Sequence, residues 1–228
     1  MLEKVGRPQF SNSIASNISK ELVGIFRKRK TTRMFQKQKV DRDILLNAIA
    51  VAGTAPSGAN KQPWSFVLID DDETMNLIRE KSEQEERKFY NETGPEKWLN
   101  DLKHLHTNED KSFITDACCL IPVFSKNFSV DEENNKSNNY YVKESVGLAT
   151  GMLISALHLC GLSVLTYTPS NRNFMVDLLG RPKSEKTFMV LVVGVASDEL
   201  EVPVISKKSL SDIVSVYKGV EAREPKSN

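Results

Sequence analysis

The chain has 228 residues, 39% of them hydrophobic, which is enough to bury one substantial core in a single domain. Its 31 basic and 30 acidic residues nearly cancel, and this balance argues against nucleic acid or an anionic membrane as a general partner. Residues 1–20 are polar and lack the apolar run of a signal peptide, so we expect no membrane anchor in this chain. The three cysteines lie in apolar surroundings without Cys-x-x-Cys spacing, which predicts reduced core thiols and a soluble, cytoplasmic protein.

The region before residue 70 joins a helical pattern to a strand pattern. Apolar residues recur at helical spacing over 42–53, with Asp41 as the candidate N-cap and Gly53 placed to end the helix. Residues 54–60 form a loop of small residues, and the apolar run 66–69 then predicts a strand. The loop has two readings: it can turn the chain, or it can lay its backbone against a flat ligand.

A charged segment over about 80–111 follows a helix that begins near Met75. Aromatic and leucine side chains recur among its charges, which indicates an amphipathic excursion covering something rather than a structureless linker. Beyond it, 120–124 predicts a strand, and the proline within that run favours an edge position or a strand end. Residues 129–139 are polar and predict a surface loop.

The second half of the chain contains its most apolar segments. Residues 142–160 are apolar on nearly all sides, as in a helix buried centrally or against a partner. Gly161 separates this helix from a β-rich run that ends at Thr168, and a short helix ends at Gly180. The run 187–195 predicts a strand buried on both faces. The alternation of helices and strands favours an α/β or α+β fold without internal repeats.

Few local clusters point to chemistry by themselves. Arg27–Arg33 contains five cations in seven residues, which suits either a solvated or nuclear-localising run or a phosphate site. His104 and His106 lie on an amphipathic segment without a nearby cysteine or carboxylate pattern, so we expect no metal site there. The sequence has neither a Gly-x-Gly-x-x-Gly motif nor a P-loop, which removes the common nucleotide-binding loops.

Several short motifs, taken in order, resemble those of the nitroreductase-like flavoproteins and, within them, the iodotyrosine deiodinase (halotyrosine dehalogenase) branch. They are Arg29-Lys30-Thr31-Thr32-Arg33, the Thr54–Asn60 loop with Gln62-Pro63-Trp64, Glu86 with Tyr90, Thr107-Asn108 with Lys111, Thr166–Pro169, Leu179–Pro182 and Lys207–Leu210. The resemblance covers roughly residues 27–216, nearly the whole chain. Its order and spacing are hard to obtain by chance.

The resemblance implies a fold and an assembly. It predicts an α+β, nitroreductase-like fold in which helices wrap a mixed central sheet, and an intertwined homodimer with one FMN at each subunit interface. The corresponding domain spans residues 27–217 and carries a lid insertion over about 80–111. Residues 1–26 would then be an N-terminal arm and 218–228 a polar C-terminal tail.

The resemblance also implies roles for individual residues. Thr168 would hydrogen-bond flavin N5 and is the predicted catalytic residue, while the backbone N–H of Ala59 would meet the substrate's phenolate oxygen. Glu86 would pair the ammonium of an amino-acid substrate and Lys111 its carboxylate, with Tyr90 completing the grip. The predicted cofactor-binding residues are Arg29, Lys30, Thr31, Thr32, Arg33, Ser57, Thr166, Tyr167, Thr168 and Lys207.

The chain departs from the family pattern at three of these positions. Lys30 and Lys207 stand where arginines are typical, which keeps the charge but loses bidentate geometry toward a phosphate. Tyr167 replaces a small hydroxyl residue between Thr166 and Thr168, and the sequence does not tell which way its ring points.

The implied activity is FMN-dependent reductive dehalogenation of halotyrosines, such as iodotyrosine to tyrosine plus iodide, in one-electron steps. Electrons would come from an NAD(P)H-linked reductase or directly from NAD(P)H. Two alternatives stay open: a generic NAD(P)H-dependent nitroreductase or quinone reductase on the same scaffold, and a flavin- or amino-acid-binding sensor without useful turnover.

Overall fold

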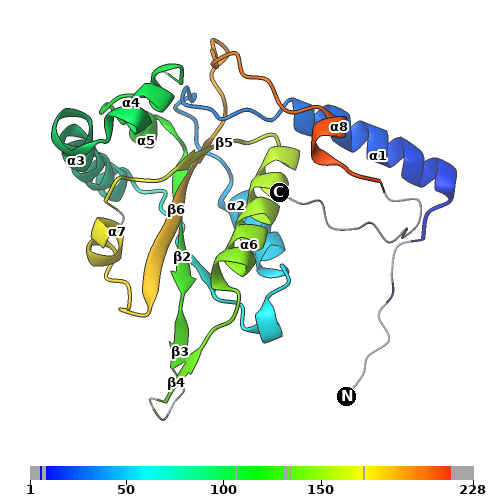
Figure 1. Ribbon diagram of the computed structural model, residues 1–228, viewed down its shortest axis with the longest axis horizontal. Helices are drawn as coiled ribbons and strands as arrows, with labels where there is room; N and C mark the ends of the chain where they lie inside the picture. Colours follow the sequence, from blue (N-terminus) through cyan, green and yellow to red (C-terminus); the bar gives the residue numbers. More distant parts are fainter. Residues whose placement is uncertain are drawn as a thin grey trace, which may run out of the picture.

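The computed structural model describes residues 6, 9–105, 107–130, 133, 135–171 and 173–216. Its centre is a four-stranded sheet with strands in the order β1-β2-β6-β5, covered by helices on both faces (Figure 1). The strands are β1 (Trp64–Phe66), β2 (Cys119–Lys126), β6 (Glu185–Gly194) and β5 (Ser163–Tyr167). The α+β expectation is confirmed, and β6 is buried on both faces as its sequence predicts.

One face of the sheet is covered by α2 (Arg42–Gly53) and α6 (Val142–Leu159), which also pack on each other (Figure 1). Asp41 caps α2 as predicted, because its carboxylate accepts the Asp43 N–H at 3.0 Å. The buried apolar residues of these helices form one core cluster with alternate residues of the central strands. From β2 and β6 that cluster receives Cys119, Ile121, Val123, Leu191 and Val193.

The opposite face carries α3 (Asp72–Lys88), α5 (Phe113–Asp116) and α7 (Asn173–Leu178). A π-helical turn, η2 (Phe89–Thr93), and α4 (Glu96–Lys103) continue α3 away from the sheet. The intervening residues of the central strands, Leu120, Phe124, Val190 and Val192, point to this second core cluster. Strand side chains alternate between faces, so two helical layers share one sheet.

The prediction of a mixed sheet is wrong for the ladders of the described residues, all of which are antiparallel. After β5 the chain passes through the short α7 and returns beside β5 as β6, which makes that pair antiparallel. Parallel pairing within the described chain is a single bridge between Thr31 and Val164, where the Thr32 N–H donates to the Val164 carbonyl at 3.5 Å. The segment carrying Thr31 passes β5 too briefly to add a fifth strand.

Pro122 lies in the inner strand β2, so the prediction of an edge position is wrong. Its carbonyl accepts the Val67 N–H at 3.1 Å, and the side of β2 that lacks a donor therefore faces the edge strand β1. The β1 ladder ends at Phe66, and pairing resumes at the bridge between Ile69 and Leu120. Pro122 therefore lies in the inner strand β2, and the ladder of the edge strand β1 ends beside it.

The predicted surface loop over 129–139 is also wrong in part, because its flanks pair as an antiparallel hairpin. The two short strands are β3 (Phe128–Val130) and β4 (Lys136–Asn138). Their exposed side chains are mostly polar, so the sequence lacks the apolar alternation that marks a half-buried strand. Backbone pairing, rather than burial, produces this hairpin.

Two glycines act as the sequence predicts. Gly161 has a φ of +80° between α6 and β5, and Gly180 has a φ of +58° after α7. Only a residue without Cβ adopts that conformation readily, so both positions suit chain reversal after a helix. The three cysteines are free thiols, but Cys160 is exposed beside this turn, so its prediction as a core residue is wrong for the single chain.

The described ends of the chain lie outside this core. α1 (Asn12–Arg27), which the sequence patterns did not predict, buries none of its residues, and it projects away from the sheet (Figure 1). α8 (Leu210–Ile213) follows a long exposed stretch and is unburied as well. Within the described residues, no helix combines the length and apolarity needed to cross a membrane. The predicted tail, 218–228, lies outside the described residues.

Candidate active site

A cavity of about 520 Å³ lies between the end of β5 and the segment that runs from α3 to α5. Its apolar wall is formed by Phe89, Trp98, Leu102, Phe113 and Leu165. The titratable and hydroxyl-bearing residues that line it include Arg33, Glu86, Tyr90, Lys111, Thr166 and Thr168. The charged segment over 80–111 therefore covers this cavity, because its apolar residues form much of the wall.

A buried ion pair, Glu86 with Lys111, is the main electrostatic feature of the cavity. Glu86 Oε2 lies 3.5 Å from Lys111 Nζ, and the two residues are only 6% and 5% exposed. The Lys111 ammonium also donates to the Asn108 carbonyl. Burial lowers the pKa of Lys111, and the neighbouring Glu86 carboxylate opposes that shift. A carboxylate from α3 and an ammonium from the loop before α5 thus face each other, and both side chains are buried.

The second oxygen of Glu86 is held by the loop that follows β5. Glu86 Oε1 accepts the Ser170 N–H at 3.1 Å and the Tyr167 hydroxyl at 3.4 Å. The Tyr167 ring packs edge-on against Phe113, with centroids 5.9 Å apart, and burial raises the pKa of its phenol. Tyr167 therefore points toward the acid, whereas Thr166 and Thr168 alternate to the exposed side of the chain.

Tyr90 stands one turn after Glu86, on the same side, as the four-residue spacing predicts. Its hydroxyl donates to Thr107 Oγ1 at 3.1 Å, which joins η2 to the loop before α5. Lys111 Nζ lies 5.6 Å from the Tyr90 ring centroid, within the range of a cation–π contact. The three predicted substrate-binding side chains, Glu86, Tyr90 and Lys111, are therefore brought together.

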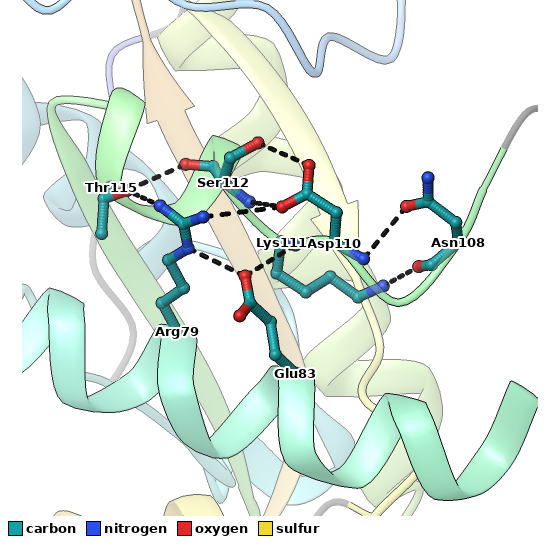
Figure 2. A network of polar contacts seen from close by, with 7 residues as sticks. All are labelled: Arg79, Glu83, Asn108, Asp110, Lys111, Ser112 and Thr115. Atoms are coloured by element: carbon teal, nitrogen blue, oxygen red, sulfur yellow. Dashed lines mark hydrogen bonds and ion pairs between the residues drawn. The ribbon is translucent and has the colours of Figure 1, made fainter.

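Behind Lys111 lies a polar network that the sequence motifs did not indicate (Figure 2). Arg79 and Glu83 rise from α3 toward the turn that carries Asp110 and Lys111, and Arg79 Nε donates to Glu83 Oε1 at 2.8 Å. The four-residue spacing of Arg79 and Glu83 is a visible signal. In a segment so rich in charges, however, such a spacing is common and does not distinguish one pair.

The basic run passes along β5 and reaches two cavities. Arg29, Lys30 and Thr32 border a small hollow of about 60 Å³, together with His158, whereas Arg33 borders the large cavity. Burial lowers the pKa of Arg33. Thr31 is used in the backbone bridge to β5. In the described part of the chain, no carboxylate forms an ion pair with Arg29, Lys30 or Arg33.

Ser57, Ala59 and Lys207 are not brought to this cavity within one chain. The short 3-10 turn η1 (Gly58–Asn60) precedes β1, at the sheet edge opposite β5, and the Gly58 N–H donates to Ser145 Oγ of α6 at 3.4 Å. The Gln62 N–H donates to Ser57 Oγ at 2.9 Å. Lys207 is exposed on the stretch before α8.

The small residues of this loop have a local reason as well. A Cβ at Gly58 would lie 2.9 Å from the Tyr140 carbonyl oxygen, so the backbone leaves no room for a side chain. Ala59 and Asn60 adopt positive φ values of 49° and 51°, which makes this a tight and strained turn. The turn exposes Ala59, so this small residue is available to a ligand or a second chain.

Comparison with known proteins identifies the family of this chain. Residues 26–195 match the Nitroreductase family. The iodotyrosine deiodinase of Haliscomenobacter hydrossis is 39% identical over 189 residues, 83% of this chain and 85% of that protein. Iodotyrosine deiodinase 1 of Homo sapiens is 37% identical over 197 residues, 86% of this chain and 68% of that protein. The crystal structure of oxidized iodotyrosine deiodinase bound to FMN and 3-iodo-L-tyrosine aligns with a TM-score of 0.71 at 30% identity, covering 87% of this chain and 99% of that one. The resemblance drawn from the motifs is confirmed.

Proposed function

Because the chain belongs to the nitroreductase family, we propose that it is an FMN-dependent enzyme that reductively removes halide from halotyrosines. The observation that carries this proposal is the buried Glu86–Lys111 pair on the wall of the large cavity. A zwitterionic amino acid offers one ammonium and one carboxylate, so it can separate this pair and satisfy both charges. A neutral nitroaromatic or quinone makes no use of such a pair.

The residues present fit FMN. Arg29 and Lys30 are cations without a carboxylate partner among the described residues, which suits a phosphate, and Arg33 would face the pyrimidine side of the flavin. Thr166 and Thr168 line the cavity and are exposed, and Thr168 would hydrogen-bond flavin N5. When bound, FMN would supply the electrons that cleave the carbon–halogen bond, delivered one at a time.

Side chains of the lid, which we define as residues 80–111, would bind the substrate and exclude water. Glu86 would bind the substrate ammonium, with its Oε1 already held by Ser170 and Tyr167, and Lys111 would bind the carboxylate. Tyr90 would close over the ligand from the same helical face. Phe89, Trp98 and Leu102 would exclude water from the aromatic ring, since they form the apolar wall.

We expect the active unit to be a homodimer, because the predicted site residues are divided within one chain. Ser57 and Ala59 lie beyond β1, whereas the cavity lies beside β5, at the opposite edge of the sheet. α6 leaves an apolar groove of about 1000 Å³ that includes Leu148 and Leu159, which are 52% and 54% exposed. A second copy seated on this groove would cover it and bring the partner subunit's Ala59 toward the cavity.

Replacing Leu148 with glutamate should therefore separate the dimer and release FMN. A charge placed within a buried apolar interface costs free energy that an exposed position does not. We expect size-exclusion chromatography with light scattering to give twice the chain mass for the wild type and the single-chain mass for Leu148→Glu. Leu77→Glu is the matched control, because Leu77 is an exposed leucine of α3, on the opposite face of the sheet from that groove. A wild-type monomer that retains FMN would contradict the dimer proposal.

The activity is tested with flavin reduced by dithionite in the absence of oxygen. On addition of 3-iodotyrosine we expect release of iodide and reoxidation of the flavin absorbance, both measured on the same sample. NADPH then replaces dithionite to test for a direct electron donor. Nitroaromatic turnover with NADPH, without any iodide release, would favour the general nitroreductase. Binding of 3-iodotyrosine without reoxidation would favour a sensor.

A further inference from the structure

Two charged residues beside the cavity have no role in the proposed chemistry, although they contact the segment that carries Lys111. Glu83 lies one turn before Glu86 on α3, and its Oε1 accepts two donors. One is Arg79 Nε at 2.8 Å and the other is the backbone N–H of Lys111 at 3.2 Å. The Glu83 carboxylate thus joins α3 directly to the backbone of the residue that would bind the substrate's carboxylate.

Arg79 extends this connection to α5 and to the preceding turn. Its Nη1 donates to Thr115 Oγ1 at 3.0 Å, and its Nη2 lies 3.6 Å from Asp110 Oδ1 (Figure 2). Asp110 in turn accepts the Ser112 N–H at 2.9 Å and the Ser112 hydroxyl at 3.0 Å. One guanidinium therefore contacts Glu83 of α3, Asp110 of the turn and Thr115 of α5 through its fixed fork of N–H groups.

This geometry fixes the backbone from which the Lys111 side chain extends. Glu86 and Lys111 are 25 positions apart in the sequence and come from different segments, so α3 by itself does not set their separation. While Glu83 accepts the Lys111 backbone N–H, the Lys111 side chain extends so that its Nζ lies 3.5 Å from Glu86 Oε2. A displacement of about 1 Å in such a contact is enough to reduce binding of a charged group strongly.

We propose that Glu83 and Arg79 are positioning residues, which hold Lys111 opposite Glu86 so that the cavity receives a zwitterionic substrate. This inference rests on the proposed function. A plain surface ion pair at this helical spacing contributes little and would act alike on every substrate. A positioning role instead affects substrates that use Lys111 and spares those that do not.

The test compares 3-iodotyrosine with 2-iodophenol, which has the iodinated ring but no zwitterion. For Glu83→Ala we expect the Michaelis constant for the iodinated amino acid to rise about tenfold, whereas kcat/KM for 2-iodophenol stays within about twofold. Glu83→Gln, which keeps one acceptor oxygen, should show a smaller rise in KM. Arg79→Lys, which keeps the charge and loses the fork, should fall between the wild type and Glu83→Ala.

Glu85→Gln is the matched control, because Glu85 is on the same helix and its ion pair with Lys88 spans 3.7 Å at the surface. It should leave both substrates unchanged. FMN affinity and melting temperature are measured for every variant, so a folding defect is recognised by a lowered melting temperature together with loss of FMN. In a variant that is folded and binds FMN, equal loss on both substrates, or an unchanged Michaelis constant for the iodinated amino acid in Glu83→Ala, overturns the positioning role. A wild type that neither binds 3-iodotyrosine nor releases iodide overturns the proposed function and this inference with it.

Discussion

Replacing Lys111 with methionine is expected to weaken 3-iodotyrosine binding by more than about 100-fold while FMN stays bound. Methionine is similar in length and apolar, but it removes the buried ammonium that faces Glu86 at 3.5 Å. The Glu86 carboxylate would then be buried at 6% exposure without its cation, which can cost up to about 3–5 kcal/mol of stability. Titration of the flavin absorbance with 3-iodotyrosine and thermal unfolding measure the two effects.

The double variant Glu86→Gln with Lys111→Met separates stability from binding. Neutralising both partners leaves neither member of this pair as an unpaired buried charge, so the melting temperature should recover relative to Lys111→Met. Iodotyrosine binding should not recover, because neither charge of the zwitterion then has a partner. If Lys111→Met loses FMN as strongly as iodotyrosine, the assignment of this pair to the substrate is wrong.

Replacing Ala59 with leucine is expected to weaken halotyrosine binding by more than about 100-fold without loss of FMN. Ala59 is exposed within one chain, and in the proposed dimer its backbone N–H would meet the substrate's phenolate oxygen. A leucine side chain would fill the space that the phenolate ring needs. Equilibrium titrations with 3-iodotyrosine, with FMN content measured on the same samples, distinguish the two ligands.

Ala59→Gly is the matched control for this variant. Glycine keeps the N–H and suits the φ of 49° better than any other residue, so binding should persist and the loop should tolerate the change. Tight 3-iodotyrosine binding by Ala59→Leu would show that this loop does not face the substrate. Loss of FMN from Ala59→Leu would equally contradict the assignment, because the loop would then serve the cofactor.

The predictions that held depended on local signals. The cap at Asp41 and the reversals at Gly161 and Gly180 each involve only a few neighbouring residues. The predictions that failed depended on pairing that the side-chain pattern does not show. Pro122 favours an edge position or a strand end in the sequence, because the sequence does not tell which strand lies on the side of β2 that lacks a donor. The hairpin at 129–139 was missed because its pairing involves backbone atoms, which leave little trace in side-chain pattern.

The candidate site divides in the same way. Glu86, Tyr90 and Lys111 were found through the family motif, and the chain places all three around one cavity. The supporting groups, such as Glu83 and Ser170, have no motif, since any acid or any backbone N–H in the right place would serve. The direction of Tyr167 could not be predicted either, because the face of β5 that its ring enters depends on how α3 and α5 pack.

By itself, then, the sequence determined the core helices α2 and α6, the strand β6 that is buried on both faces, the α+β class and, through its motifs, the nitroreductase family. These properties follow from backbone preferences and apolar periodicity within a few residues, and from spacings that survive as motifs. Only the tertiary structure decided the antiparallel order of the sheet, the burial of Glu86 against Lys111 and the separation of Ala59 from both within one chain. Those features arise from many weak contacts between distant segments, none of which is encoded at a single position.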